Sequence, residues 1–325
     1  MKFSKIILFG LSIFLSCKEK NGYVEYHGEA QGTTFLIKYH TAEEKELQEE
    51  IDSIFNRMDA LFSGYKEDSY VSRFNSSKEG LPVDYDFLDL WEKCWELSIE
   101  TDGYFDPTLS PVIKIYREMK SQSIDSASIE EALSHTGMPL VIHSGDSLKK
   151  KDPHLKIDLD AVAQGYTVDV LSRFLEKQGS DNYLIEVGGE VYAKGKNEKN
   201  KKWTIGIDKP IQGERKMLTT IEMDGSSMAT SGNYRKFKEI GGKKVGHILN
   251  PKSGYPMETN VLSVSVISRF CYRADALATA LMNRSVADIK DFDAGNNDVQ
   301  IILVEVADSD TLIYVSPELS EKIKL

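Results

Sequence analysis

The chain has 325 residues, of which 41% are hydrophobic and 28% are charged, so it can bury a large core and is not a disordered polymer. Its 40 lysines and arginines are outnumbered by 51 aspartates and glutamates, which leaves a net charge of −11. This charge offers no basic surface for a polyphosphate backbone, so we expect no nucleic-acid partner.

The first residues have the features of an export signal. Lys2 and Lys5 are followed by an apolar run, residues 6–15, that is too short to span a bilayer as a helix. A basic start, a short apolar run and a small residue before the cleavage point are typical of a signal peptide. We therefore expect residues 1–16 to be a signal peptide and the protein to be exported.

Cys17 directly follows this segment, and residues 14–17 resemble the lipobox of bacterial lipoproteins. The resemblance implies that Cys17 carries the acyl chains, that residues 17–23 form a short tether, and that the protein faces the periplasm from a bacterial membrane. Several acyl chains exceed the two signals that stable anchoring requires. The resemblance does not distinguish the inner membrane from the outer one. The alternative to a lipoprotein is an ordinary signal peptide followed by an incidental cysteine.

Two further cysteines, Cys94 and Cys271, are too few for a disulfide framework. Cys94 lies in the apolar helical stretch 90–97, where an unpaired cysteine usually behaves as a small buried hydrophobe. Whether the two thiols meet is left open by the sequence.

In the first half, residues 26–40 predict a pair of strands around two glycines. A helix is expected next, because apolar residues recur at helical spacing up to Phe62, and Thr41 with Glu44 forms a capping box at its start. A second helix is predicted over residues 85–101 and ends at Gly103.

Residues 121–152 are polar and weakly patterned, with one short capped helix from Ser128, and we interpret them as an excursion between two halves. The second half is predicted to contain a helix over residues 161–178 and a strand over residues 183–187 that leads into a paired-glycine turn. The remaining expected elements are strands at 203–207, 218–223, 262–268, 299–306 and 312–315, and a helix at 273–282. The alternation predicts layered α and β structure, a fold of the α+β class.

The common nucleotide and zinc signatures are absent: the sequence has no GxxxxGK[ST] loop, no GxGxxG after a strand and no HExxH. Asp275 and Thr279 are four residues apart on a predicted helix, which places a carboxylate beside a hydroxyl. These are two hard oxygen ligands of the kind that Mg²⁺ uses when phosphates and water complete its octahedron. Alone, this spacing is common and favours an exposed Asp and a helix-bonded Thr over a metal site.

Eight short segments set Asp275 and Thr279 in a wider pattern. They occur, in chain order, at residues 32–35, 62–75, 103–108, 157–166, 186–190, 229–234, 247–251 and 253–256. Together they resemble the ApbE family, the FAD:protein FMN transferases, over nearly the whole chain after the tether. The resemblance implies one transferase domain over residues 24–325, built as two interleaved α+β halves with the FAD site between them.

The resemblance also implies a Mg²⁺-dependent reaction in which FMN passes from FAD to a Thr or Ser hydroxyl of a target flavoprotein subunit and AMP leaves. Asp275 and Thr279 match the family's metal ligands, with the backbone carbonyl of Ala161 as the third. The residues that match the family's FAD contacts are Gln31, Tyr65, Tyr104, Phe105, Asp106, Asp158, Gln164 and Ile248.

His247 is the histidine within a matched motif, and a neutral imidazole could take the proton from the attacking hydroxyl or orient that hydroxyl. A histidine that only bonds to loop backbone is the alternative. Gln164 departs from the commonest family pattern, which has a charged residue there, as do Gln31, Asp160 and Asn250 at their positions. Two other functions therefore remain open: an FAD pyrophosphatase that gives FMN and AMP, and a non-catalytic FAD-binding lipoprotein.

Overall fold

The computed structural model describes residues 22–41, 45–119, 125–211, 216–233, 237–240, 243–246, 248–257, 259–307, 310–320 and 322–323. The predicted signal peptide, Cys17 and most of the tether lie outside these residues. Across the part of the chain that is described, no helix is both long and apolar enough to cross a membrane.

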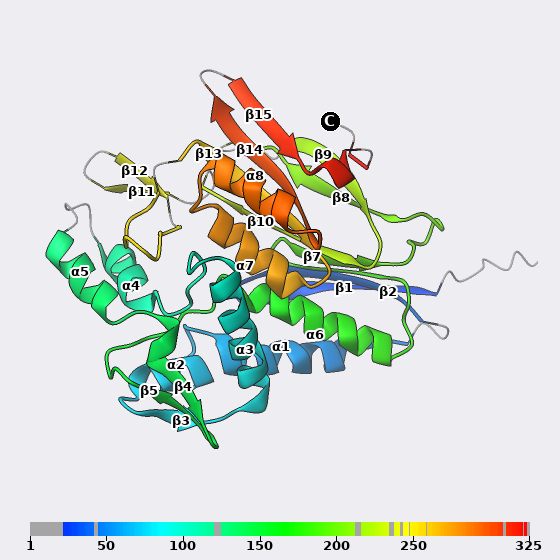
Figure 1. The fold of residues 1–325 in the computed structure, drawn as a ribbon. Coiled ribbons are helices and arrows are strands. Elements are labelled where there is room, and N and C mark those ends of the chain that lie inside the picture. The colour runs from blue at the N-terminus through cyan, green and yellow to red at the C-terminus, as the bar shows by residue number, and fades with distance from the viewer. Residues whose placement is uncertain are drawn as a thin grey trace, which may run out of the picture.

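An eight-stranded sheet forms the centre of the molecule, and each neighbouring pair of its strands is antiparallel (Figure 1). In spatial order the strands are β1 (Tyr23–Ala30), β2 (Thr33–His40), β6 (Tyr183–Val187), β7 (Glu190–Lys194), β10 (Ser226–Gly232), β13 (Val261–Ser268), β14 (Val299–Ala307) and β15 (Asp310–Val315). One sheet thus combines strands from both ends of the sequence.

Helices and three smaller sheets surround this centre. The helices are α1 (Gln48–Phe62), α2 (Tyr70–Ser76), α3 (Tyr85–Glu100), α4 (Ser110–Glu118), α5 (Ser126–Ser134), α6 (Ala163–Lys177), α7 (Cys271–Leu281) and α8 (Val286–Gly295), with 3₁₀ turns at Met138–Leu140 and Pro317–Leu319. The smaller sheets contain β3 (Gly80–Pro82), β5 (Ser147–Lys150) and β4 (Val141–Ser144); β8 (Trp203–Asp208) and β9 (Met217–Met223); and β11 (Phe237–Ile240) and β12 (Lys243–Gly246).

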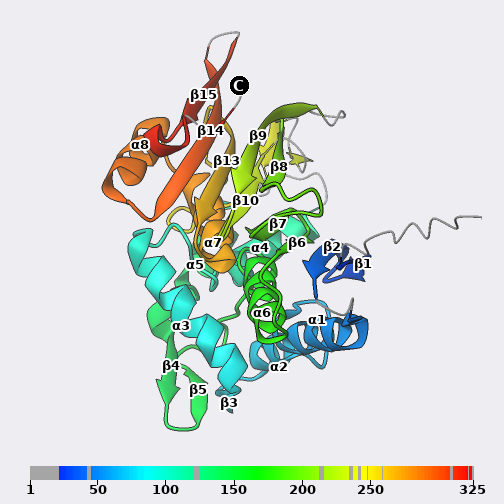
Figure 2. The same ribbon diagram turned by 90° about the vertical axis from the view of Figure 1, so that its right-hand side faces the viewer.

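The two faces of the central sheet have different coverings. On one face, Ile37 of β2 and Ile185 of the neighbouring β6 pack against α1 and α6, with Leu171 of α6 at the contact. On the other face, Trp203 and Ile221 of the β8–β9 pair pack against side chains of β7, β10, β13 and β14. Figure 2 shows the β8–β9 pair on one side of β13 and β10, and α3 and α8 on the other side.

The first predicted strand pair is confirmed, with its turn at Gln31 and Gly32, which both have positive φ. The predicted capping box is wrong. The helix begins at Gln48, its N-cap is Leu47, and the Thr41 hydroxyl instead accepts the N–H of Lys45 ahead of the helix. The periodic apolar residues thus locate the helix, while the polar pattern at residues 41–44 does not mark its start.

The polar excursion also contains more structure than its composition suggests. Residues 141–150 contain two strands: β5 pairs with β3 on one side and with β4 on the other, and Leu148 of β5 is completely buried against the helical core. The short helix α5 is capped by Asp125 and begins at Ser126. Cys94 and Cys271 are both buried and unpaired, as expected of small apolar residues. The α+β class predicted from the sequence is confirmed by this mixture of helices and antiparallel sheets.

Candidate functional site

A cavity of about 1340 Å³ opens where the loops after α3 and before α6 meet the ends of β6, β7 and β10. The structure brings most of the predicted site residues to its lining: Tyr65, Tyr104, Phe105, Asp106, Asp158, Ala161, Gln164, Ile248, Asp275 and Thr279. They come from segments that are far apart in sequence, and both halves of the chain contribute.

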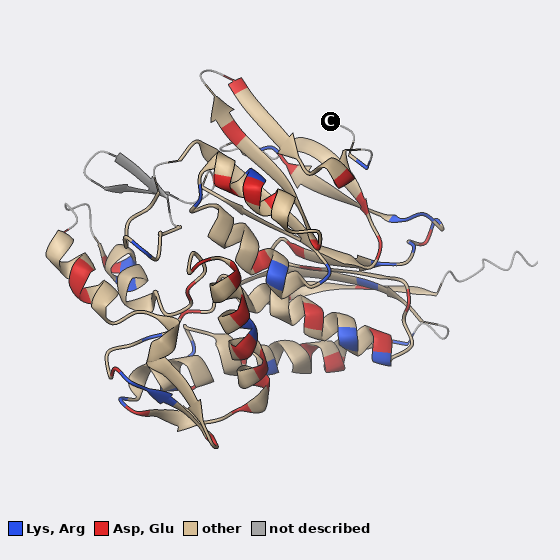
Figure 3. Ribbon diagram, in the orientation of Figure 1, with Lys and Arg blue, Asp and Glu red and all other residues tan. Residues whose placement is uncertain are grey.

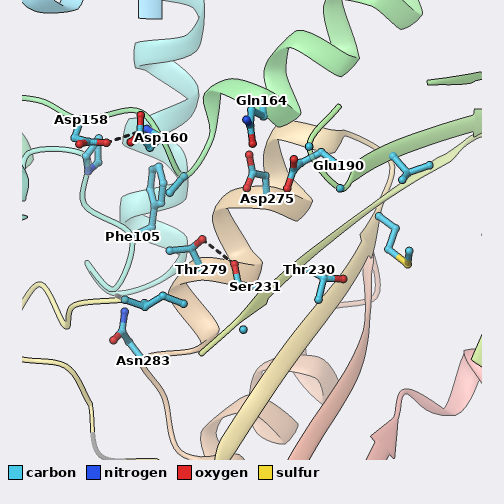
Figure 4. Close-up of a pocket in the computed structure, with 18 of the residues that line it drawn as sticks. Phe105, Asp158, Asp160, Gln164, Glu190, Thr230, Ser231, Asp275, Thr279 and Asn283 are labelled. Atoms are coloured by element: carbon cyan, nitrogen blue, oxygen red, sulfur yellow. Dashed lines mark hydrogen bonds between the residues drawn. The ribbon is translucent and has the colours of Figure 1, made fainter. Parts of the chain in front are cut away.

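Asp275 lies on the face of α7 that points into this cavity, where it is 7% exposed (Figure 4). Its carboxylate accepts a hydrogen bond from the Gly165 N–H at 3.1 Å, and no lysine or arginine pairs with it among the described residues. Burial raises the pKa of Asp275 to about 7. A buried carboxylate without a basic partner is unfavourable unless a cation compensates it, so the position suits a metal ion.

Thr279 lies one turn along α7 from Asp275, and its hydroxyl is 3.0 Å from the Ser231 hydroxyl at the end of β10 (Figure 4). The Gly165 N–H, which could close a helical turn onto the carbonyl of Ala161, instead bonds to Asp275. No other described backbone group donates to that carbonyl. A carboxylate, a hydroxyl and a free carbonyl are all hard oxygen donors, so these residues fit Mg²⁺.

The close contact of α6 with α7 holds this corner together. Gly165 has no side chain because a Cβ there would lie 2.5 Å from the Cys271 carbonyl oxygen and 2.9 Å from the Asp275 Cβ. Asp169, one turn further along α6, accepts the N–H groups of Cys271 and Tyr272, each at 2.9 Å, at the start of α7. Asp169 thereby satisfies two of the helix's unpaired N–H groups, and burial raises its pKa to about 6.

The segment predicted to contact the nucleotide follows α3. Phe105 is buried and its N–H is bonded to the Thr101 hydroxyl, which fixes the loop. One oxygen of Asp106 accepts both the N–H and the hydroxyl of Thr108, and burial raises the pKa of this carboxyl. The Asp106 side chain is therefore oriented before any ligand arrives.

Two cations lie over the ring of Tyr104. The Lys252 ammonium is 4.2 Å from the ring centroid and the Arg284 guanidinium 4.8 Å. Cation–π contacts of this kind hold an aromatic ring in place. Tyr104 is thus positioned by its neighbours at the cavity wall rather than free to fold over a bound ring.

Charged side chains form a cluster at the mouth of the cavity. Arg117 of α4 bonds to Asp160 at 2.9 Å and lies 3.1 Å from Asp158, and the Tyr65 hydroxyl donates to Asp160 at 3.1 Å. Arg117 also lies over the Tyr65 ring. Tyr65 is 74% exposed, so these contacts hold an otherwise mobile ring at the entrance.

Two polar side chains, Gln164 of α6 and Glu190 at the start of β7, lie near Asp275 beside the glycine turn between β6 and β7 (Figure 4). A Cβ on Gly188 would lie 3.0 Å from Gln164 Oε1 and 3.1 Å from Glu190 Oε2, and the φ of Gly188 is positive, so only glycine fits this turn easily. Glu190 is buried and lines the cavity beside Asp275.

Three predicted residues do not reach the described lining. Gln31 lies in the β1–β2 turn, where its Nε2 donates to the Thr167 hydroxyl and its Oε1 is buried without a hydrogen-bond partner. His247 and Cys17 lie outside the described residues, so their predicted roles are not tested. Ile248, next to His247 in sequence, does line the cavity.

Sequence reasoning missed four side chains that the structure places at the site: Arg117, Asp169, Glu190 and Ser231. Asp169 and Glu190 carried a usable signal, since each is an acidic residue within an apolar run, and such residues are buried only for a reason. Arg117 carried no such signal in the sequence, because an arginine on a short amphipathic helix is typical of any solvent-facing surface.

The chain is similar to known proteins over most of its length. The profile of the ApbE family matches residues 31–303. A relative from Vibrio cholerae named FAD:protein FMN transferase is 34% identical over 287 residues, which are 85% of this chain and 86% of the relative. A relative of the same name from Escherichia coli K12 is 30% identical over 306 residues, 87% of each chain.

Solved structures give the same result. The flavin transferase ApbE from Vibrio cholerae superposes with a TM-score of 0.83 at 29% identity and covers 92% of this chain and 99% of its own. The apo form of the Pseudomonas stutzeri flavinyl transferase ApbE superposes with a TM-score of 0.83 at 28% identity, over 92% of this chain and 96% of its own. This chain therefore belongs to the ApbE family.

Proposed function

We propose that this protein is an FAD:protein FMN transferase that depends on Mg²⁺. The observation that supports this most is the buried Asp275, placed with Thr279 and the Ala161 carbonyl in the same cavity as the loop from Tyr104 to Asp106. An oxygen-donor corner beside a preformed nucleotide-sized cavity is what phosphoryl-type transfer requires, since such reactions depend on positioning and charge stabilisation. The relatives' names support the same activity.

The reaction exchanges one phosphate bond for another. The hydroxyl oxygen of a Thr or Ser on the acceptor protein bonds to the phosphorus of the FMN half of FAD, and the bond from that phosphorus to the bridging oxygen breaks. AMP leaves with this oxygen, and the hydroxyl proton passes to a base. His247 is our candidate for that base.

Asp275, Thr279 and the Ala161 carbonyl would hold the Mg²⁺ ion, which when bound would neutralise charge on the pyrophosphate. Asp106 is held by Thr108 and presents a fixed acceptor to the nucleotide. Phe105 and Ile248 are buried apolar walls that exclude water from the ligand.

We further propose that the protein is exported and anchored by lipid on Cys17 to a membrane that faces the periplasm. β1 begins at Tyr23, so the tether from Cys17 is only a few residues long. At about 3.5 Å per residue, such a tether reaches no more than about 20 Å. The transferase would then act on acceptors held close to the same membrane. Labelling with radioactive palmitate, compared between the native chain and Cys17→Ser, tests the anchor.

Intact mass spectrometry tests the transfer. The chain from residue 21 is incubated with FAD, Mg²⁺ and a candidate flavoprotein subunit, and the subunit is weighed after denaturation. We expect a mass gain equal to FMN minus water that disappears when Mg²⁺ is chelated. An unmodified subunit with AMP and free FMN in solution would instead show that the protein is a pyrophosphatase. If FAD stayed intact with every candidate subunit, the protein would be a non-catalytic FAD-binding protein.

His247 can be tested in the same assay. If it is the general base, His247→Ala should slow transfer by about a hundredfold or more, since general acid–base catalysis typically contributes that much. FAD affinity, measured from quenching of flavin fluorescence, should change little. A normal transfer rate would make His247 a structural residue of its loop.

A further inference from the structure

The cavity extends beyond the residues that match the family's FAD contacts. Those of them that line the cavity lie after α1, after α3, at the start of α6 and after β12. The cavity continues to the other side of the sheet, where Leu36 and Leu184 line it together with five consecutive residues of β8, residues 204–208. No predicted site residue lies in this second part. The total volume, about 1340 Å³, also exceeds the roughly 300–1,000 Å³ of an ordinary small-molecule pocket.

The lining by β8 is unusual for a strand. Side chains alternate between the two faces of a strand, so a strand that presents a face to a cavity contributes every second residue. Five consecutive lining residues indicate that the edge of β8 is what borders the cavity. Among the described residues β8 pairs only with β9, in a two-stranded sheet, so its other edge has no strand partner.

The outer face of β8, next to this edge, is open to solvent. Gly206 is exposed in the middle of β8, and a Cβ there would meet only the Met217 sulfur at 3.6 Å. A glycine inside a strand often marks a place where another backbone approaches closely. Thr204, two residues away, is exposed as well.

The loops at the two ends of β8 are basic in a chain that is strongly acidic. The described residues 196–211 and 216 contain six exposed lysines and only two acidic residues, Glu198 and Asp208. The lysines are Lys196, Lys199, Lys201, Lys202, Lys209 and Lys216. Figure 3 shows basic residues in the loop between β7 and β8. This charge is complementary to an acidic segment that lies along β8.

We propose that the free edge of β8 is the docking site for the acceptor protein, which binds there as an extended, acidic segment that adds a strand to the β8–β9 sheet. The proposal rests on the proposed function and specifies how the protein substrate is held. Strand addition uses main-chain hydrogen bonds for affinity, so it can hold a segment whose side chains vary. The Thr or Ser hydroxyl of the segment then enters the part of the cavity that contains Asp275, Thr279 and Ser231.

Amide hydrogen exchange tests the docking directly and needs no turnover. The probe is a twelve-residue peptide with one central threonine and two aspartates on each side of it. A second version has valine in place of threonine, so it cannot accept FMN. With FAD and Mg²⁺ present, the valine peptide should slow exchange of the β8 amides at least tenfold, while β4, a free edge of the three-stranded sheet, stays unchanged. Protection that avoids β8, or protection of β8 by FAD alone, would overturn the proposal.

Charge reversal gives an independent test. Lys201→Glu with Lys202→Glu should raise the KM for the threonine peptide about tenfold and leave FAD affinity unchanged, because both lysines are exposed and neither lines the cavity that contains the predicted FAD contacts. Lys149→Glu, an exposed lysine on β5, is the matched control and should change neither quantity. Replacing the peptide's aspartates with lysines should have the same effect as reversing the protein's charge. The docking site would be contradicted if the KM for the threonine peptide were the same for the native chain and the Lys201→Glu, Lys202→Glu variant, and the same for the aspartate and lysine peptides.

The two proposals fail in different ways. If the native chain binds FAD but transfers FMN to no acceptor, the proposed function is wrong, whatever the exchange at β8 shows. If FMN is transferred while the β8 amides exchange as in the free protein, the function stands and the docking site is wrong.

Discussion

The corner where α6 meets α7 and the cluster at the mouth of the cavity are built in opposite ways. The corner depends on buried backbone contacts: Gly165 lets the helices touch, and Asp169 binds the first N–H groups of α7. The mouth depends on partly exposed side chains, Arg117, Asp160 and Tyr65. The corner cannot move without disturbing the core, whereas the mouth can rearrange at little cost.

This difference matches the tasks that we propose for the two regions. A metal ligand must stay within a few tenths of an ångström of its position, which requires support from packed, rigid elements. A cavity mouth must admit a large nucleotide, and exposed ion pairs contribute little stability, so they can open easily. Substitutions at the corner should therefore have much larger effects than substitutions at the mouth.

The largest effect is expected at Asp275. Asp275→Asn should reduce transfer by roughly a thousandfold or more, because it removes the charged oxygen ligand. Above pH 7, and with both proteins free of metal, the melting temperature of the variant should equal or exceed that of the native chain. The reason is that the variant no longer buries a carboxylate whose pKa is raised to about 7. Thermal unfolding and the mass assay measure the two effects. Mg²⁺-stimulated transfer in this variant would contradict the metal assignment.

Gly165→Ala tests the packing that supports the corner. The new Cβ would lie 2.5 Å from the Cys271 carbonyl oxygen, so α6 and α7 must separate. We expect a loss of about 1 to 3 kcal/mol of unfolding free energy and of at least tenfold in transfer rate. Gly295→Ala, at the end of α8 where a Cβ meets nothing within 4 Å, is the control and should change both quantities little. Similar urea midpoints for the two variants would disprove the close-packing argument.

Asp169 should make the stability of the protein depend on pH. Its folded-state pKa of about 6 lies above that of an unfolded aspartate, so the folded chain binds the proton more tightly. The contribution of this group to the free energy of unfolding is fully present below about pH 4. It falls by roughly 2 to 3 kcal/mol as the pH rises through about 6. In Asp169→Asn this loss should be missing. Urea unfolding at pH 4.5 and pH 6.5 measures it, and parallel pH dependences for both chains would contradict the assignment.

The smallest effect is expected at the mouth. Asp160→Ala removes the contacts to Arg117 and Tyr65, and because all three side chains are largely exposed to water, stability should change by less than about 1 kcal/mol. The KM for FAD should rise a fewfold while kcat stays within about twofold. Steady-state kinetics with varied FAD separates the two constants. A collapse of kcat would mean that the mouth takes part in the chemistry.

Sequence and structure agree best where local pattern determines the element. Apolar periodicity located α1 and α3, and the strand at residues 183–187 was predicted with its observed ends. The start of α1 was misplaced because Thr41 and Glu44 resemble a cap, whereas burial of Leu47 decides where the helix begins. Pattern alone does not include that tertiary contribution.

The site was predictable only in part, and for a physical reason. Asp275 and Thr279 are neighbours on one helix, so their spacing was visible in the sequence. The contact of Gly165 with Cys271, and the approach of Arg117 to Asp160, join segments that only the fold brings together. β8 has no strand at its second edge within the described ranges, and no local pattern of the sequence encodes that arrangement.

Anomalous scattering would show whether α7 and the start of α6 hold a metal ion, as we propose. Crystals grown with FAD and Mn²⁺ in place of Mg²⁺ would locate the ion independently of activity. We expect one strong peak at coordination distance, roughly 2.0–2.6 Å, from Asp275 and Thr279 side-chain oxygens and the Ala161 carbonyl. A peak elsewhere in the cavity, with Asp275 bonded only to the Gly165 N–H, would contradict the account.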